Sequence, residues 1–304
     1  MVMIKRVLAL LGSGALAILL LRQAETAAQA VRDGIQLCLT SVIPALFPFF
    51  AVSSLLVALG AAEAAGRVLA RPFRRLFRCG GAGCAALLLG LVGGYPVGAR
   101  TAAELVRRGE LSPAEGARLL TFCNNAGPAF AIGVAGVSVF GSARTGAWLY
   151  LLHCAAALLT GLLFCRRPLP VTAMPKRPVP PRAGLTGQFL RAVEGAVSAM
   201  ARVCGFVVFF LVLLRLAEGL IGPLPPLAAG VLELTNGILR LTPDRRGFVT
   251  AAALLGWGGL SVHCQTAAVT AGSGISLRLY LPAKAVQAAL SAGLAALLAP
   301  YLLP

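Results

Sequence analysis

Long apolar stretches interrupted by glycine and proline are the feature that most constrains how this chain folds. Of its 304 residues, 58% are hydrophobic and only 12% are charged, whereas about a quarter of a soluble globular chain is charged. A helix of roughly 20 apolar residues crosses a bilayer. We therefore expect an all-α, multi-pass membrane protein in contact with the lipid bilayer, built on stretches at Val7–Leu21, Ile35–Leu59, Ala82–Thr101, Gly146–Cys165, Val193–Leu220 and Lys284–Leu303.

The charge distribution indicates which ends of these stretches face the cytoplasm. The chain has 27 Lys and Arg against 10 Asp and Glu, a net charge of +17. In a soluble domain this excess would suggest nucleic-acid binding. Here the basic residues lie between apolar stretches without interleaved aromatic residues, which is typical of cytoplasmic loops. No nucleic-acid partner is expected, and the cytoplasmic segments are predicted at Arg67–Arg78, Arg107–Arg108 and Arg166–Arg182.

The cysteine pattern gives no sign of a metal site. Eight cysteines are scattered along the chain, mostly within apolar runs. They form neither a CxxC pair nor a Cys/His cluster at zinc spacing. We expect no metal ion, no cofactor and no disulfide framework, and the oligomeric state is left open.

The predicted cytoplasmic segments imply two inverted halves. Ala82–Glu104 must enter and leave on the same side, so it is predicted to be a re-entrant hairpin. Ile35–Leu59 then runs inward and Val193–Leu220 outward. We accordingly divide the chain into an N-terminal span or signal segment (1–30), a first repeat with a connecting span (31–165), a cytoplasmic linker rich in Pro and Arg (166–190) and a second, inverted repeat (191–304).

A short internal match supports the presence of a repeat. GGYPVGARTAA at Gly93–Ala103 resembles GGLSVHCQTAA at Gly258–Ala268. Inverted repeats with broken helices are typical of secondary transporters, which bind substrate near the bilayer midplane. Non-helical backbone at that depth is tolerated only where it is buried in protein or lines a wet cavity.

The first candidate binding segment is the turn Gly94, Tyr95, Pro96. Glycine and proline can unwind this turn and turn backbone amides toward a ligand. Arg100 adds a guanidinium group suited to a carboxylate. The alternative is that Arg100 pairs with Glu104, one helical turn away.

Two further breaks carry polar side chains inside apolar stretches, where such residues point to function. The first contains Asn124 and Asn125, which either contact a ligand or pair between helices. The second contains Gly259, Ser261, His263 and Gln265; His263 either carries a proton or packs as a neutral ring. Arg202 is a secondary candidate for an anion contact. No nucleophile, base and acid occur together at a spacing that would indicate an enzyme.

The blocks SVIPALFPFF, GGYPVGART, LSPAEGARLLTFCNNAGPAF and GGLSVHCQ together resemble the YlbJ-type sporulation integral membrane proteins of the nucleoside-recognition (gate) group. The resemblance extends from about Ile35 to Leu298. It implies an endospore-forming source, a place in the outer forespore membrane and movement of dipicolinic acid into the forespore. It also implies a core similar to that of the concentrative nucleoside transporters. The family is commonly longer, and has Ser or Thr where Asn125 and Ala126 stand here.

From the residues and the resemblance together we expect a transporter of a small organic anion, with dipicolinic acid as the first candidate. A nucleoside-like metabolite is the alternative substrate, in which case the amide side chains would contact a base. A membrane protein that assists spore-envelope assembly without transport is the alternative from another class. The coupling ion is left open between none, a proton and sodium.

Overall fold

The computed structural model describes residues 2–59, 61–166 and 184–302. Within these ranges the chain is helical and contains no strand. Four helices are long and apolar enough to cross a membrane, and a bent helix pair near the N-terminus raises the number to five. The expected all-α, multi-pass membrane fold is therefore confirmed.

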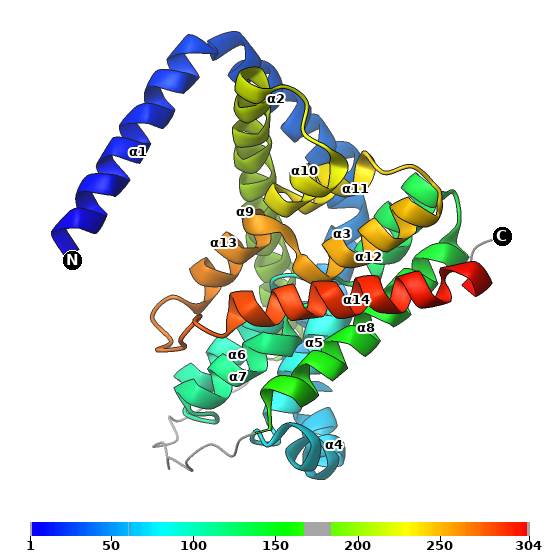
Figure 1. Cartoon of the computed structure of the whole chain (residues 1–304). Helices are drawn as coiled ribbons and strands as arrows, with labels where there is room; N and C mark the ends of the chain where they lie inside the picture. Colours follow the sequence, from blue (N-terminus) through cyan, green and yellow to red (C-terminus); the bar gives the residue numbers. More distant parts are fainter. Residues whose placement is uncertain (1, 60, 167–183, 303–304) are drawn as a thin grey trace.

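The N-terminal helices form the outer part of the molecule. Helix α1 projects away from the rest (Figure 1), and Leu8, Leu10, Leu11 and Leu21 are exposed, as expected for contact with lipid, whereas Leu16, Leu19 and Leu20 at its end are partly buried. A 94° bend separates it from α2. Helix α2 passes into a π-helical segment before α3, which contains Pro48. The bounds are α1 Val2–Arg22, α2 Ala24–Leu37, η1 Cys38–Val42 and α3 Ile43–Ala58.

Helix α4 (Ala61–Phe77) shows the amphipathic pattern expected for a surface-lying segment. Phe73 and Phe77 are buried, whereas Arg71, Arg74 and Arg75 are exposed. The phenylalanines pack against Phe122 with ring-centroid distances of 6.3 and 4.6 Å. The arginines thus remain free to face water or lipid headgroups.

Helices α5 (Gly83–Gly93) and α6 (Val97–Arg107) form a tight hairpin. Gly90 and Gly98 face each other across it and both touch the end of the next helix. A Cβ atom added to Gly90 or Gly98 would lie 1.8 or 1.9 Å from the carbonyl oxygen of Cys123. Glycine is required at both positions because the backbones are in direct contact.

The next helix is broken where the sequence predicts a break. Helix α7 (Pro113–Cys123) begins with the expected capping box of Ser112 and Glu115. It ends before Asn124, and helical structure resumes at Ala129 in η2 (Ala129–Val139). The uninterrupted helix α8 (Ala143–Phe164) follows.

Apart from α4, which has no counterpart between α9 and α10, the second half has the same order of elements: a long helix, a hairpin, a broken helix and a long helix. Most of the predicted 166–190 linker lies outside the described residues, and α9 already begins at Leu185. The elements are α9 Leu185–Ile221, the hairpin α10 Pro226–Leu232 and α11 Leu234–Leu239, the broken helix α12 Arg245–Trp257 and α13 Gly259–Thr270, and α14 Tyr280–Leu302.

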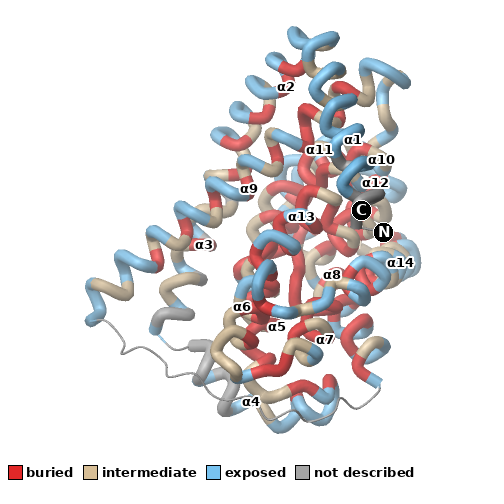
Figure 2. The backbone as a smooth tube through the Cα atoms, turned by 90° about the vertical axis from the view of Figure 1, so that its left-hand side faces the viewer, coloured by how far each residue is buried: buried red, intermediate tan, exposed pale blue. Residues whose placement is uncertain are grey.

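This order pairs the segments differently from the short sequence match. Gly93–Ala103 lies at the tip of the first hairpin, whereas Gly258–Ala268 lies at the break between α12 and α13. By element order, the first hairpin corresponds to α10 and α11. Figure 2 shows that buried backbone gathers around α5, α11 and α13, whereas α1 and α2 are mostly exposed. The hairpins and broken helices thus form the interior.

Candidate functional site

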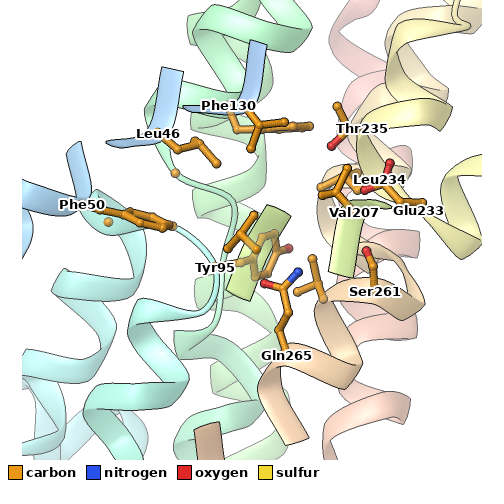
Figure 3. Close-up of a pocket in the computed structure, with 16 residues that line it drawn as sticks. Leu46, Phe50, Tyr95, Phe130, Val207, Glu233, Leu234, Thr235, Ser261 and Gln265 are labelled. Carbon is orange, nitrogen blue, oxygen red and sulfur yellow. The ribbon is translucent and has the colours of Figure 1, made fainter. Parts of the chain in front are cut away.

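A cavity of about 50 Å³ lies where the two hairpin tips meet the two helix breaks. Figure 3 shows Leu46 and Phe50 on one side of it and Glu233, Leu234 and Ser261 on the other. Helices α3 and α9 close the remaining walls with apolar side chains. The residues contributed by the hairpins and breaks are Gly93, Gly94, Tyr95, Gly127, Phe130, Glu233, Leu234, Thr235, Ser261, Val262 and Gln265.

Tyr95 ties the first hairpin tip to the second broken helix. Its hydroxyl donates to the carbonyl oxygen of Leu255 at 2.8 Å. Gly258 lies directly behind the phenol, since a Cβ atom there would be 3.1 Å from the hydroxyl oxygen, and its φ of 92° also favours glycine. Gly94 touches the first break, with its Cβ position 2.9 Å from the amide nitrogen of Gly127.

The tip of the first hairpin is unwound, as predicted, but the backbone amides at its two ends still make hydrogen bonds. The amide of Gly94 donates to Gly90, and the amide of Val97 donates to Gly94. Gly259 is also a packing residue, because a Cβ atom there would lie 3.0 Å from the amide nitrogen of Leu234. Gly94 and Gly259 therefore allow the backbone segments around them to approach closely.

Two polar side chains that line the cavity have buried atoms with no hydrogen-bond partner within the structure. They are the hydroxyl oxygen of Ser261 and the side-chain carbonyl oxygen of Gln265. Such atoms are costly to bury unless something satisfies them. A bound ligand that makes hydrogen bonds to the hydroxyl and to the amide group, each of which can donate as well as accept, would satisfy both side chains.

A second, smaller cavity of about 20 Å³ adjoins the first through Gln265, which lines both. Arg100 and Arg202 line it from α6 and α9, together with Pro96. Arg202 donates to Ser198 at 2.8 Å. Arg100 makes no ion pair with any described residue, because Glu104 pairs instead with Arg107 and Arg108, at 3.9 and 2.8 Å. Two guanidinium groups thus border one cavity without a carboxylate partner there.

Asn124 and Asn125 lie behind the cavity in a network of hydrogen bonds. The Asn124 amide group donates to Thr266 at 2.8 Å and to Tyr280 at 3.1 Å. Asn125 donates to the carbonyl oxygen of Phe122 and accepts from Gln287 at 2.9 Å. Both asparagines thus make interhelical hydrogen bonds, the second of the two roles we considered, while the side-chain oxygen of Asn124 is buried without a partner within the structure.

Both histidines pack in this interior. Nδ1 of His263 lies 3.2 Å from the hydroxyl of Tyr280, and its Nε2 is buried with no partner within the structure. Nε2 of His153 accepts the amide hydrogen of Ala126 at 3.0 Å, so it must be unprotonated. That bond satisfies a backbone donor that the first helix break leaves free.

Two charged residues near the breaks were not among the sequence candidates. Glu233 lines the cavity, caps α11 and accepts from the amide of Asn236 at 2.8 Å. Lys284 is fully buried in α14 and donates to the carbonyl oxygen of Asn124. A single charged residue inside an apolar stretch was the available signal in both cases.

The sequence candidates thus fall into three groups. Gly94, Tyr95, Ser261 and Gln265 line the first cavity, and Gln265 also lines the second. Pro96, Arg100 and Arg202 line the second. The remainder, Asn124, Asn125, Gly259 and His263, support the breaks from behind.

Comparison with known proteins finds a family match and a relative. Residues 39–144, which contain the first hairpin and the first helix break, match the nucleoside-recognition (gate) family. The chain is also 27% identical over 310 aligned positions to the sporulation integral membrane protein YlbJ of Bacillus subtilis (strain 168), covering 85% of this chain and 74% of that protein. The resemblance to YlbJ-type membrane proteins is confirmed. No solved structure matches the chain.

Proposed function

We propose that this chain is a membrane transporter of a small organic anion and that it acts in spore formation. The observation that carries the proposal is the pair of adjoining cavities at the helix breaks, which share Gln265 and include Arg100 and Arg202. Guanidinium groups bind carboxylates with two parallel hydrogen bonds. Two of them at one cavity suit a ligand with two carboxylates.

Dipicolinic acid is the first candidate substrate, moved into the forespore across the outer forespore membrane. It is a planar dicarboxylate, and the similarity to YlbJ supports a sporulation role. Ligand pockets commonly measure 300 Å³ or more, whereas the first cavity measures about 50 Å³. Binding therefore requires a conformation in which the cavity is larger, as expected for a carrier that alternates between states.

A nucleoside-like metabolite is the second candidate substrate because Glu233 lines the first cavity. A carboxylate repels an anion but accepts hydrogen bonds from ribose hydroxyls or a base. The match of residues 39–144 to the nucleoside-recognition family also favours a nucleoside-like substrate. Competition between dipicolinate and nucleosides for uptake separates the two candidates.

Uptake of radiolabelled dipicolinate into proteoliposomes tests the proposal. We expect uptake by the wild type and at least a tenfold loss of apparent affinity in Arg100→Ala. Arg278→Ala is the matched control, since Arg278 is an exposed arginine between α13 and α14. Absence of uptake by correctly inserted wild-type protein would overturn the transport proposal. It would favour instead a non-transporting role in spore-envelope assembly.

We also propose that residues 31–165 and 191–304 form two inverted repeats, as the repeated order of elements suggests. Cysteine labelling from each side of the membrane tests this. In a background without other reactive cysteines, Arg177→Cys should label from the cytoplasm and Arg245→Cys from the opposite side. Labelling of both from one side would contradict the inversion.

A further inference from the structure

Lys284 is a lysine buried inside the protein, in a helix apolar enough to cross a membrane, and it has no carboxylate partner among the described residues. Its side chain has no exposed surface, and no ion pair involves it among the described residues. Burial of an uncompensated charge costs several kcal/mol, so such a group persists only with good ligands. The ligands of Lys284 therefore indicate why a charge is kept there.

Oxygen atoms around the first helix break supply those ligands. The ammonium group donates to the main-chain carbonyl oxygen of Asn124 at 3.0 Å and to the side-chain oxygen of Gln287 at 2.7 Å. It also lies 5.4 Å from the centre of the Tyr95 ring, within cation–π range. Asn124 ends α7, so its carbonyl is among those that have no partner in the helix and carry partial negative charge.

The surrounding groups add no negative charge. Those that face Lys284 from neighbouring elements are Cys123, His153, His263 and the phenol of Tyr95. Helix α12 packs along α14 in the opposite direction, so that Gly256 lies near Ala288 while Arg245 binds the carbonyl of Ala296 near the far end. The positive charge of Lys284 is thus opposed mainly by carbonyl dipoles.

We propose that Lys284 is the resident cation of the transport site. Its ammonium group holds the end of α7 through carbonyl oxygens, the type of ligand that a bound Na⁺ would take at a broken helix. It also contacts Tyr95, which lines the first cavity. Neither the stability of the break nor transport then requires Na⁺. The statement about transport rests on the proposed function, whereas the statement about stability does not.

The statement about stability is tested by thermal unfolding of the purified protein in NaCl and in choline chloride at equal ionic strength. We expect the wild type to unfold at the same temperature in both salts, within about 1 °C. Lys284→Met keeps most of the volume but loses the charge, and should unfold at least about 3 °C lower in both salts. Lys284→Ala should also unfold lower, but Na⁺ should raise its midpoint by about 3 °C or more by binding the freed oxygens.

Ser291→Ala is the matched control, because Ser291 is a buried residue on the same face of α14. It should show no response to Na⁺. The proposal is overturned if Na⁺ specifically stabilises the wild type, if Lys284→Met is as stable as the wild type, or if Lys284→Ala does not respond to Na⁺. The methionine variant keeps the test decisive if the alanine variant does not fold.

Uptake tests the transport half. Replacement of Na⁺ by choline should change the initial rate of dipicolinate uptake by the wild type less than twofold. A tenfold loss would overturn the proposal. If no substrate is taken up in either salt, the proposed function fails while the unfolding data still decide the role of Lys284.

Discussion

The two broken helices meet at the same cavity, but the polar groups near each break are accommodated differently. At the end of α7, Asn124 has an extended backbone, and Lys284, His153, Tyr280 and Gln287 make hydrogen bonds to the polar groups around it. The side-chain oxygen of Asn124 and Nδ1 of His153 are the buried atoms there that keep no partner within the structure. At the start of α13, Gly258 turns the chain through a left-handed conformation. Beyond it, polar atoms of Ser261 and Gln265 face the cavity without partners.

This difference distinguishes residues that stabilise the fold from residues that are available to bind a ligand. A buried polar group that has its partners fixes the relative position of helices, and its loss destabilises the fold. A buried polar group without partners costs stability and is kept for another reason. We therefore expect variants at the end of α7 to affect folding and variants at the start of α13 to affect uptake.

Gly90→Ala should give the largest effect. The new methyl group would meet the carbonyl oxygen of Cys123 at 1.8 Å, and neither backbone can move without shifting α7. We expect a loss of about 3 kcal/mol or more in unfolding free energy, or failure to fold. Gly205→Ala is the control, because nothing lies within 4 Å of its Cβ position in α9. It should be neutral or stabilising, and equal losses in the two variants would contradict the predicted contact.

Asn124→Leu and Gln265→Leu form a matched pair, since both exchange a buried amide for an apolar group of similar size. Asn124→Leu removes the amide hydrogens that Thr266 and Tyr280 accept, so we expect a loss of about 2–4 kcal/mol in unfolding free energy. Gln265→Leu removes an atom without a partner and should change stability by less than about 0.5 kcal/mol.

The two variants should affect uptake in the opposite order: Gln265→Leu should reduce uptake more than Asn124→Leu does. Gln265→Leu should abolish transport in a folded protein, whereas residual folded Asn124→Leu should keep part of it. Chemical denaturation and proteoliposome uptake on the same preparations provide the measurement. If Gln265→Leu transports normally, the unpartnered atoms of α13 do not contact the substrate.

Local patterns predicted the breaks, and distant contacts decided what the breaks do. Ser112, Pro113 and Glu115 lie within one turn, so the start of α7 could be predicted from sequence alone. Gly127 and Pro128 likewise made the end of α7 predictable. The role of Asn124 depends on Thr266, Tyr280 and Lys284, which are far away in the sequence. No spacing rule within one helix could reveal those contacts.

Arg100 and Lys284 show the same limit of prediction from sequence. Spacing predicted that Arg100 either pairs with Glu104 or faces a ligand, and only the structure shows Glu104 turned toward Arg107 and Arg108. Lys284 stood at the expected start of the last span, where a cation is ordinary. Helix α14 in fact begins at Tyr280 and places Lys284 inside, fully buried.

The starts of the two broken helices offer the smallest and most local test of the comparison. The hydroxyl of Ser112 caps α7 and does not titrate, whereas the carboxylate of Asp244 caps α12. The hydrogen bond that Asp244 accepts from the amide of Gly247 at 2.7 Å, aided by the hydroxyl of Thr242, lowers the pKa of this exposed carboxyl group. The stabilisation is therefore present above the unfolded-state value of about 3.9 and is lost as the pH falls through the folded-state value.

Hydrogen exchange measures this difference amide by amide. Protection of the Gly247 amide should fall severalfold between about pH 4 and pH 2 in the wild type, because protonation of Asp244, whose pKa is lowered, weakens it as an acceptor. In Asp244→Asn it should stay level, since an asparagine cap does not titrate. An equal fall in both variants would mean that the loss of protection begins elsewhere, and the Asp244 cap would then not control the start of α12.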